Sequence, residues 1–375
     1  MTVAGSPRRL ALDVLSRIER DGAYANLALR AALNRCDLDR RDRAFATDLV
    51  YGTTRMRRAC DYLLNQFIEH DVEPAVRTVL RLGAYQLHWA GVPAHAAVDA
   101  TVSEAPQRAR GLCNAVLRRV ADYQPDWPGP AVQHSYPDWL VNRLVADLGS
   151  DHALTALAAM NEPALPVARP DGYRQDRASQ LVSTLVADGI RPDGGPVLDV
   201  CAAPGGKATA LASVGALVVA GDASVGRLGL VGDNARQLGL HLSMVAADGR
   251  LPPFRSGAFQ SVLVDAPCSG LGVLRRRADA RWRVVESDVS DLARLQVELL
   301  RAALPLVAPG GRLFYSVCTL TAAETVDVDE AFRGATDARP AGPMPKPWRP
   351  HGTGGLLLPQ DLDSEGMAVF AYRVG

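Results

Sequence analysis

Apolar residues recur at helical spacing along the first 160 residues of the chain. One such stripe consists of Leu10, Val14, Leu15 and Ile18. Similar stripes run through residues 45–56, 76–89 and 116–120, and no alternating strand pattern interrupts them. Apolar positions with this period share one face of an α-helix and can pack on a common core. The pattern therefore predicts an all-α domain over residues 1–160.

Short apolar runs in the second half of the chain have the length of buried strands. They cover residues 196–200, 216–221, 242–246, 261–264 and 311–315. Helical patterns begin near residues 175 and 208, so that strands alternate with helices, as in a parallel α/β sheet. A stretch rich in proline separates the two patterns. We therefore predict a Rossmann-like α/β domain over 175–375, joined to the helical domain by a linker at 161–174.

A turn of small residues follows the first predicted strand. It consists of Cys201, Ala202, Ala203, Pro204, Gly205, Gly206 and Lys207. Glycines there let a ligand approach the backbone closely. The turn lacks the first glycine and the Ser or Thr of a Walker A loop, and no Gly-x-Gly-x-x-Gly follows the strand. The turn therefore predicts a Rossmann-like site for a ligand without a pyrophosphate.

Three of the next strands end in an aspartate. Asp222, Asp248 and Asp265 each follow an apolar run. One strand-end aspartate is as often a helix cap as a ligand contact. Three aspartates, each at the end of a strand beside a Gly-Gly turn, favour a nucleoside pocket. Asp222 is placed to accept hydrogen bonds from the two ribose hydroxyls. Ribose and adenine without a phosphate loop suggest S-adenosylmethionine as the cofactor.

Two cysteines also follow the ends of predicted strands. Cys268 follows the predicted strand 261–264, and Cys318 follows the strand 311–315. The carboxyl ends of parallel strands are where open α/β sheets bind ligands. A lone cysteine is usually a small buried apolar residue, but two at strand ends, one of them after Asp-Ala-Pro, favour a chemical role.

Three motifs in these segments resemble the signatures of the RNA 5-methylcytosine methyltransferases. They are residues 199–207, 265–270 and 315–319. The chain is most similar to the Fmu or Sun type, also described as RsmB-like, which methylates 16S ribosomal RNA and carries a NusB-like helical domain. The resemblance covers most of the chain. It implies an all-α NusB-like RNA-binding domain over 1–160 and an α/β Rossmann-like class I methyltransferase domain over 175–375.

The resemblance also implies roles for the residues of the site. Residues Cys201 to Lys207, Asp222, Asp248 and Asp265 would bind S-adenosylmethionine. Cys318 would be the nucleophile that adds to carbon 6 of cytosine, which activates carbon 5 for methylation. Cys268 would assist release of the product, and Asp265 would orient the base or, if protonated, donate to its ring. Because a base inside a duplex is unreachable, the target must be flipped out or unpaired.

The chain departs from the family pattern at several places. Val317 stands where the family usually has a Thr before the nucleophilic cysteine, and Thr325 stands where it usually has an Asn after Glu324. Arg277-Ala278 also replaces a common His-Pro pair. Family members usually have a small α/β subdomain between the two domains, which helps hold RNA. Residues 161–174 are too few to form it. Two alternatives therefore stay open: a tRNA cytosine-5 methyltransferase, and an RNA-binding ribosome assembly factor with little or no turnover.

Charge and composition limit where RNA can bind. The formal net charge is +0, so RNA binding must use local patches. The strongest candidate is Arg275, Arg276, Arg281 and Trp282, with phosphate donors and a stacking ring. The arginines of the N-terminal part alternate with aspartates, which fits local ion pairs as well as phosphate binding.

Composition also bears on the compartment. Six cysteines at irregular spacing suggest reduced thiols and hence a cytoplasmic protein. No stretch is long enough to span a bilayer, and no residues show metal-ligand spacing. We expect a monomer without a metal ion.

Overall fold

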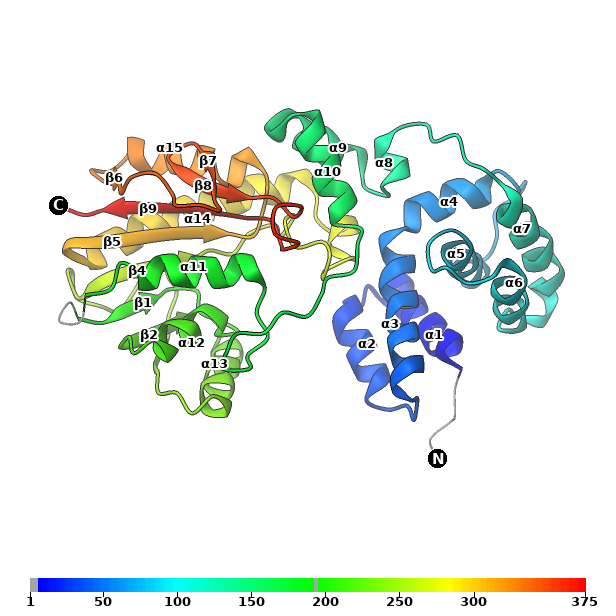
Figure 1. Ribbon diagram of the computed structural model, residues 1–375, viewed down its shortest axis with the longest axis horizontal. Helices are drawn as coiled ribbons and strands as arrows, with labels where there is room; N and C mark the ends of the chain where they lie inside the picture. Colours follow the sequence, from blue (N-terminus) through cyan, green and yellow to red (C-terminus); the bar gives the residue numbers. More distant parts are fainter. Residues whose placement is uncertain (1–5, 192–194) are drawn as a thin grey trace. The chain divides into compact units, whose positions relative to one another are not determined.

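The computed structural model describes residues 6–191 and 195–375, which form two compact units (Figure 1). The first unit comprises the described residues of Met1–Asn142 together with Arg276–Arg283, and the second comprises those of Arg143–Arg275 and Val284–Gly375. The predicted domain boundaries differ from this division, which falls within α9 (Asp138–Leu148). Residues 1–5 and 192–194 of the predicted domains lie outside the described residues.

The first unit is helical, which confirms the predicted all-α domain. Its helices are α1 (Pro7–Asp21), α2 (Ala25–Leu33), α3 (Arg40–Arg55), α4 (Arg57–Asn65), α5 (Pro74–His88), α6 (Ala94–Ser103), η1 (Gln107–Ala109), α7 (Arg110–Asp122), α8 (Pro130–Gln133) and the first residues of α9. Side-chain oxygens of Ser6 and Asp39 cap α1 and α3 by accepting from main-chain N–H groups three residues later. The apolar stripes meet in one core, in which Leu15, Leu49 and Leu80 are buried.

The segment Arg276–Arg283, which contains η2 (Ala280–Trp282), completes this helical core. The Arg281 guanidinium is fully buried, lies 3.9 Å from the centre of the Tyr136 ring, and donates to the carbonyls of Arg55 (3.3 Å) and Ser135 (3.2 Å). Burial lowers the pKa of Arg281 to about 10. The half-buried Trp282 donates its indole N–H to a carbonyl of α3 at 2.7 Å.

These positions correct the predicted RNA-binding patch. Arg275, in the second unit, is buried too: it donates to the carbonyls of Glu162 and Pro163 and forms an ion pair with Asp363 at 2.6 Å. Arg275 and Arg281 are therefore not an exposed surface for RNA, because both are buried and donate within the fold. An RNA contact by the half-buried Trp282 stays a prediction. Arg276 is half-buried.

The second unit is built on a mixed sheet with the order β3-β2-β1-β4-β5-β9-β8-β7, and β6 pairs with β9. The parallel strands are β1 (Val197–Asp199), β2 (Val218–Asp222), β3 (Ser243–Ala246), β4 (Phe259–Asp265) and β5 (Val307–Val317). They agree with the predicted strands. The antiparallel strands, which the sequence analysis did not predict, are β6 (Arg339–Pro340), β7 (Arg349–His351), β8 (Gly354–Leu357) and β9 (Met367–Arg373).

Helices flank this sheet. Helices α11 (Arg177–Ala187), α12 (Gly206–Ser213) and α13 (Val225–Gln237) pack side by side on one face (Figure 1). Helix α14 (Glu286–Ala303) packs with α15 (Val326–Gly334), and the short η3 (Leu304–Leu306) and η4 (Ala322–Glu324) adjoin them. This is the predicted Rossmann-like α/β fold. The carboxyl ends of β1, β2, β4 and β5 therefore lie along one edge of the sheet, where such folds bind ligands.

The connection between α10 (Ser150–Ala159) and α11 is a short extended segment. All of it is described, and it contains an isolated bridge between Ala168 and Arg174 but no folded subdomain. Arg169 is buried there, with its guanidinium 4.7 Å from the centre of the Tyr173 ring. It donates to the carbonyl of Gly206 (2.7 Å) and the hydroxyl of Thr209 (3.2 Å) at the start of α12. The connector thus braces the turn between β1 and α12.

Candidate methyl-transfer site

The predicted cofactor turn, Cys201 to Lys207, joins β1 to α12. Gly205 has φ +106°, a conformation that side chains disfavour, which explains the glycine. The main-chain N–H of Ala202 donates to the carbonyl of Gly221 at 2.8 Å, and Arg227 donates to the carbonyl of Ala203 at 2.9 Å. The turn is therefore held against the end of β2.

Two carboxylates face this region from β1 and β2. Asp222 is buried and accepts from the N–H groups of Ser224 (2.9 Å) and Ala203 (3.3 Å). Asp199 is buried as well, yet neither of its carboxylate oxygens has a hydrogen-bond partner among the described residues. Burial, reinforced by the charge of Asp265, raises the pKa of Asp199 to about 8. A buried carboxyl without a partner marks a place for a cationic ligand group.

An ion pair joins the cofactor turn to β4. The buried Lys207 Nζ donates to Asp265 at 2.7 Å, and the Ser316 hydroxyl donates to the other Asp265 oxygen at 2.6 Å. Burial alone would lower the pKa of Lys207. The interactions with Asp265, and then with Cys318, outweigh the effect of burial, so the pKa of Lys207 is raised. Both Asp265 oxygens are therefore engaged by donors, one of them cationic, and the role of Asp265 toward the base stays a prediction.

Asp248 differs from the other predicted acids. It follows β3 on the surface, and its side chain pairs with Arg250 at 2.7 Å. Hydrogen bonds from Arg250 lower the pKa of Asp248 to about 2. A contact between Asp248 and the cofactor stays a prediction.

The two cysteines at the strand ends come together. Cys268 Sγ and Cys318 Sγ are 3.2 Å apart, within hydrogen-bond distance for sulfur. This closeness follows from the parallel pairing of β4 and β5, in which Asp265 lies opposite Ser316. The hydrogen bond with Cys318 and burial raise the pKa of the Cys268 thiol. Either sulfur can donate the hydrogen bond that joins them.

A groove of about 410 Å³ opens beside Cys268. Cys268 and Ser269 line one part of it, and α14 contributes the apolar Leu292 and Leu295. The remaining lining residues are Val284, Asp288 and Asp291. An apolar wall with a few polar groups next to Cys268 is suited to a planar ring.

Sequence reasoning missed three residues of this region: Asp199, Arg227 and Glu324. Asp199 lies in the motif quoted for the cofactor turn, but only burial shows that its carboxyl lacks a partner. Arg227 lies on α13 and reaches both the turn and Asp222 (3.6 Å). Glu324 lies five residues after the third motif, and two of its partners, Ser269 and Gln296, come from distant segments.

The residues present fit S-adenosylmethionine. This cofactor carries positive charges on its ammonium and sulfonium groups and two ribose hydroxyls. Asp199 and Asp222 supply buried carboxyls for such groups, and the glycine turn leaves the backbone accessible. The fold and this site define a class I methyltransferase that depends on S-adenosylmethionine.

Comparisons with known proteins identify the family. The sequence model described as 16S rRNA methyltransferase RsmB/F matches residues 191–344, and the NusB family model matches residues 6–122. Ribosomal RNA small subunit methyltransferase B of Thermus thermophilus is 38% identical over 88% of this chain and 87% of its own length. The chain belongs to the RsmB/F family of 16S rRNA methyltransferases, as its motifs predicted.

Other relatives agree with this assignment. A putative methyltransferase of Mycobacterium tuberculosis, Rv1407, is 36% identical over 89% of both chains. That alignment spans 408 positions although this chain has only 375 residues, so the relative contains dozens of residues that this chain lacks. The solved structure of PH0851 has the same fold over 100% of both chains, with a TM-score of 0.78 and 19% identity.

Two features are absent from the described residues. No helix there is long and apolar enough to cross a membrane. No group of three or more His, Cys, Asp or Glu side chains in residues 6–191 and 195–375 is arranged to hold a metal ion.

Proposed function

We propose that this methyltransferase modifies carbon 5 of a cytosine in 16S rRNA through a covalent adduct between Cys318 and carbon 6. The observation that carries the proposal is the pair of thiols, 3.2 Å apart at the ends of neighbouring strands. One thiol serves to form the adduct and the second to resolve it. A single nucleophilic cysteine would not require the other at this distance.

The residues of the site have separate tasks in this reaction. The Cys318 thiolate adds to carbon 6, which turns carbon 5 into a nucleophile. The cofactor, when bound, supplies the electrophilic methyl group. Lys207, held by Asp265 and in electrostatic contact with Cys318, stabilises the negative charge that develops on the ring. The proton of carbon 5 then leaves to Cys268, and the bond between sulfur and carbon 6 breaks.

The proposed substrate follows from the family. The family description and the name of the Thermus thermophilus relative both specify the small ribosomal subunit. The site itself would serve a tRNA cytosine equally well, but the NusB match favours the ribosomal type. An enzyme with this substrate would act in the cytoplasm, where ribosomes assemble, and we propose that it does so as a monomer.

The experiment is methyl transfer from labelled S-adenosylmethionine to purified 16S rRNA and to tRNA, with the modified nucleotide mapped. We expect 5-methylcytosine at one position of 16S rRNA with the wild type and none with Cys318→Ala. RNA binding without methylation would instead assign the role of an assembly factor. A methyl group on any atom other than carbon 5 would refute the adduct.

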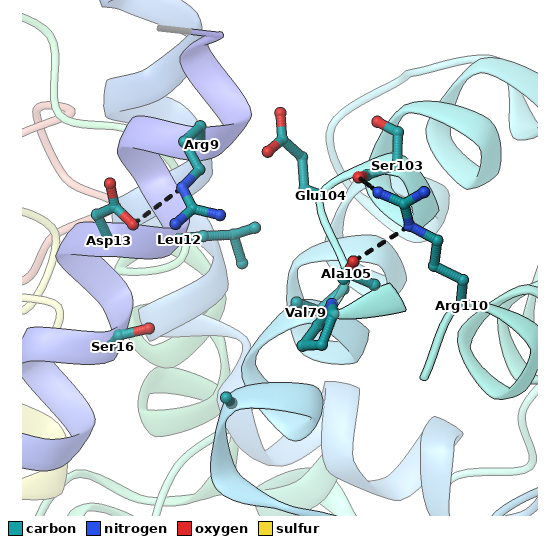
Figure 2. A pocket seen from close by; sticks show the side chains of 11 residues that line it. Arg9, Leu12, Asp13, Ser16, Val79, Ser103, Glu104, Ala105 and Arg110 are labelled. Carbon is teal, nitrogen blue, oxygen red and sulfur yellow. Dashed lines mark hydrogen bonds and ion pairs between the residues drawn. The ribbon is translucent and has the colours of Figure 1, made fainter. Parts of the chain in front are cut away.

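We also propose a new location for the phosphate contacts, on the exposed face of α7. Arg118 and Arg119 are exposed there, and neither forms an ion pair among the described residues. Arg110 begins the same helix, beside a depression of about 350 Å³. Figure 2 shows its guanidinium turned to the carbonyls of Ser103 and Ala105, while Arg9 across the depression pairs with Asp13. Arg118, which donates to Asn114, and Arg119 are therefore the arginines of α7 that pair with no anion or main-chain carbonyl among the described residues.

Salt dependence tests this surface. Each phosphate contact to single-stranded RNA contributes about 0.7 to the slope of log affinity against log salt, so R118Q/R119Q should flatten it by about 1.4. The matched control is R20Q/R236Q, which removes two exposed arginines that already pair with aspartates. Parallel plots for the wild type and R118Q/R119Q would exclude α7 as the phosphate contact.

A further inference from the structure

Glu324 is a fully buried carboxylate with donors on every side. It accepts from the N–H of Ser269 (2.8 Å), the side chain of Gln296 (3.1 Å) and the hydroxyls of Thr319 (3.0 Å) and Thr321 (3.2 Å). The Ser269 hydroxyl donates to it as well. No Lys, Arg or His among the described residues forms an ion pair with it. Each of these contacts comes from a donor, an arrangement that suits a carboxylate acting only as an acceptor.

The donors tie together the two segments that carry the thiols. Ser269 directly follows Cys268, and Thr319 directly follows Cys318. Tyr315 of β5 donates its hydroxyl to the main-chain carbonyl of Glu324 at 2.6 Å. One side chain therefore connects the ends of β4 and β5 at the position of the sulfurs.

We propose that Glu324 is a positioning residue that holds Cys268 and Cys318 together and keeps their shared proton on Cys268. The inference rests on the proposed function, in which Cys318 is the nucleophile. Two of the hydrogen bonds to Glu324 come from the residue next to Cys268, whereas the ammonium of Lys207 acts on Cys318. The charge of Glu324 opposes loss of the proton from Cys268.

Other charged and titratable groups near Cys268 act in the same direction. Cys318 is its hydrogen-bond partner, Tyr315 lies behind it, and Asp288 and Asp291 line the groove that it borders. The pKa of Cys268 is raised first by the hydrogen bond with Cys318, then by burial, and further by the charge of Glu324. Cys318 and Glu324 are thus the charged groups that oppose ionisation of Cys268.

This arrangement changes during the reaction. When Cys318 bonds to carbon 6, its sulfur becomes a thioether and no longer carries the charge that opposes ionisation of Cys268. Cys268 then releases its proton to solvent and accepts the proton that leaves carbon 5. The second thiol therefore becomes a base only after the adduct exists.

The first test removes the charge of Glu324 and keeps its shape. The initial rate of alkylation of each cysteine by iodoacetamide is followed against pH by peptide mass spectrometry, with the full chain free of RNA. In E324Q the pH midpoint for Cys268 should fall by at least about one unit, the size expected for a charge several ångströms away. E324D, which retains the charge, should keep the high midpoint. An unchanged midpoint in E324Q overturns the charge assignment.

The matched control is D329N. Asp329 is also buried and accepts from Tyr372 (2.9 Å) and Thr353 (2.9 Å), but not from the segments that carry the thiols. It should lose stability without moving the midpoint of Cys268. A shift in D329N equal to that in E324Q would show that general loosening of the fold is responsible, which also overturns the charge assignment.

A second variant tests positioning and does not depend on the folding of E324Q. S269A deletes one hydroxyl that donates to Glu324 and keeps every charge. Closure of a disulfide between Cys268 and Cys318 by diamide should be several-fold slower than in the wild type. S183A, which removes a buried hydroxyl from α11, is the control. An unchanged rate in S269A refutes the positioning role. Both tests need no RNA, so failure of methyl transfer to rRNA would reject only the proposed function.

Discussion

Replacing Asp199 with asparagine tests the electrostatics of the cofactor site. Burial and the Asp265 charge raise the pKa of Asp199 from 3.8 to about 8. Between these values the folded protein holds a proton that the unfolded chain has released. The stabilisation is therefore complete below about pH 4 and is lost as the pH rises towards 8.

The pKa shift of Asp199 sets the size of the expected change in the free energy of unfolding. One pKa unit corresponds to about 1.4 kcal/mol, so between pH 5 and pH 8 the wild type should lose about 4 kcal/mol relative to Asp199→Asn, whose amide does not titrate. Urea unfolding of both proteins without cofactor at several pH values measures this difference. Asp233→Asn, an exposed carboxylate paired with Arg236, is the control and should show no such trend. Equal pH dependence for the wild type and Asp199→Asn would refute the burial argument.

The cofactor should reverse this effect. A cationic group near Asp199 stabilises its carboxylate, so binding of S-adenosylmethionine should release a proton and become tighter from pH 6 to pH 8. Calorimetry in buffers of different ionisation enthalpy counts the proton. Asp199→Asn should bind more weakly, with little dependence on pH. If the wild type binds without proton release in this range, then Asp199 does not face the cofactor charge.

Three further predictions concern other parts of the structure. Cys318→Ala should abolish methyl transfer with little change in cofactor affinity, whereas Cys268→Ala should accumulate a covalent protein–RNA adduct on denaturing gels; turnover by Cys318→Ala would exclude it as nucleophile. Asp222→Ala should weaken S-adenosylmethionine binding roughly ten- to a hundredfold, since hydrogen bonds to charged groups contribute about 1.5 to 3 kcal/mol, and calorimetry measures the loss. Arg281→Ala should lower the free energy of unfolding by about 3 kcal/mol because it strands two buried carbonyls, while the salt dependence of RNA binding stays that of the wild type; a flatter salt plot would restore Arg281 as an RNA contact.

The cofactor turn and the strand ends could be predicted because each depends on adjacent residues. An apolar run predicts a strand, and the residue that follows it must lie at the edge of the sheet. Asp222, Cys268 and Cys318 were placed in this way, and the structure has all three at carboxyl ends of the parallel strands.

The roles of Arg281 and Glu324 could not be predicted because their partners are distant in sequence. Arg281 donates to carbonyls 146 and 226 residues away, and main-chain carbonyls leave no mark in a sequence. A cluster of arginines therefore has the same appearance whether it binds phosphate or fills a core. Glu324 accepts from a main-chain N–H 55 residues away, and a motif shows its presence but not that contact.

The segment Arg276–Arg283 has a consequence for synthesis of the protein. It completes the helical unit, whose other described residues end at Asn142. Because a chain emerges from the ribosome starting at its N-terminus, the helical unit cannot reach its final packing until residue 283 has emerged, after β1 to β4. Until then the carbonyls of Arg55 and Ser135 lack the donor that Arg281 provides. The two units, although distinct in space, should therefore finish folding late and nearly together.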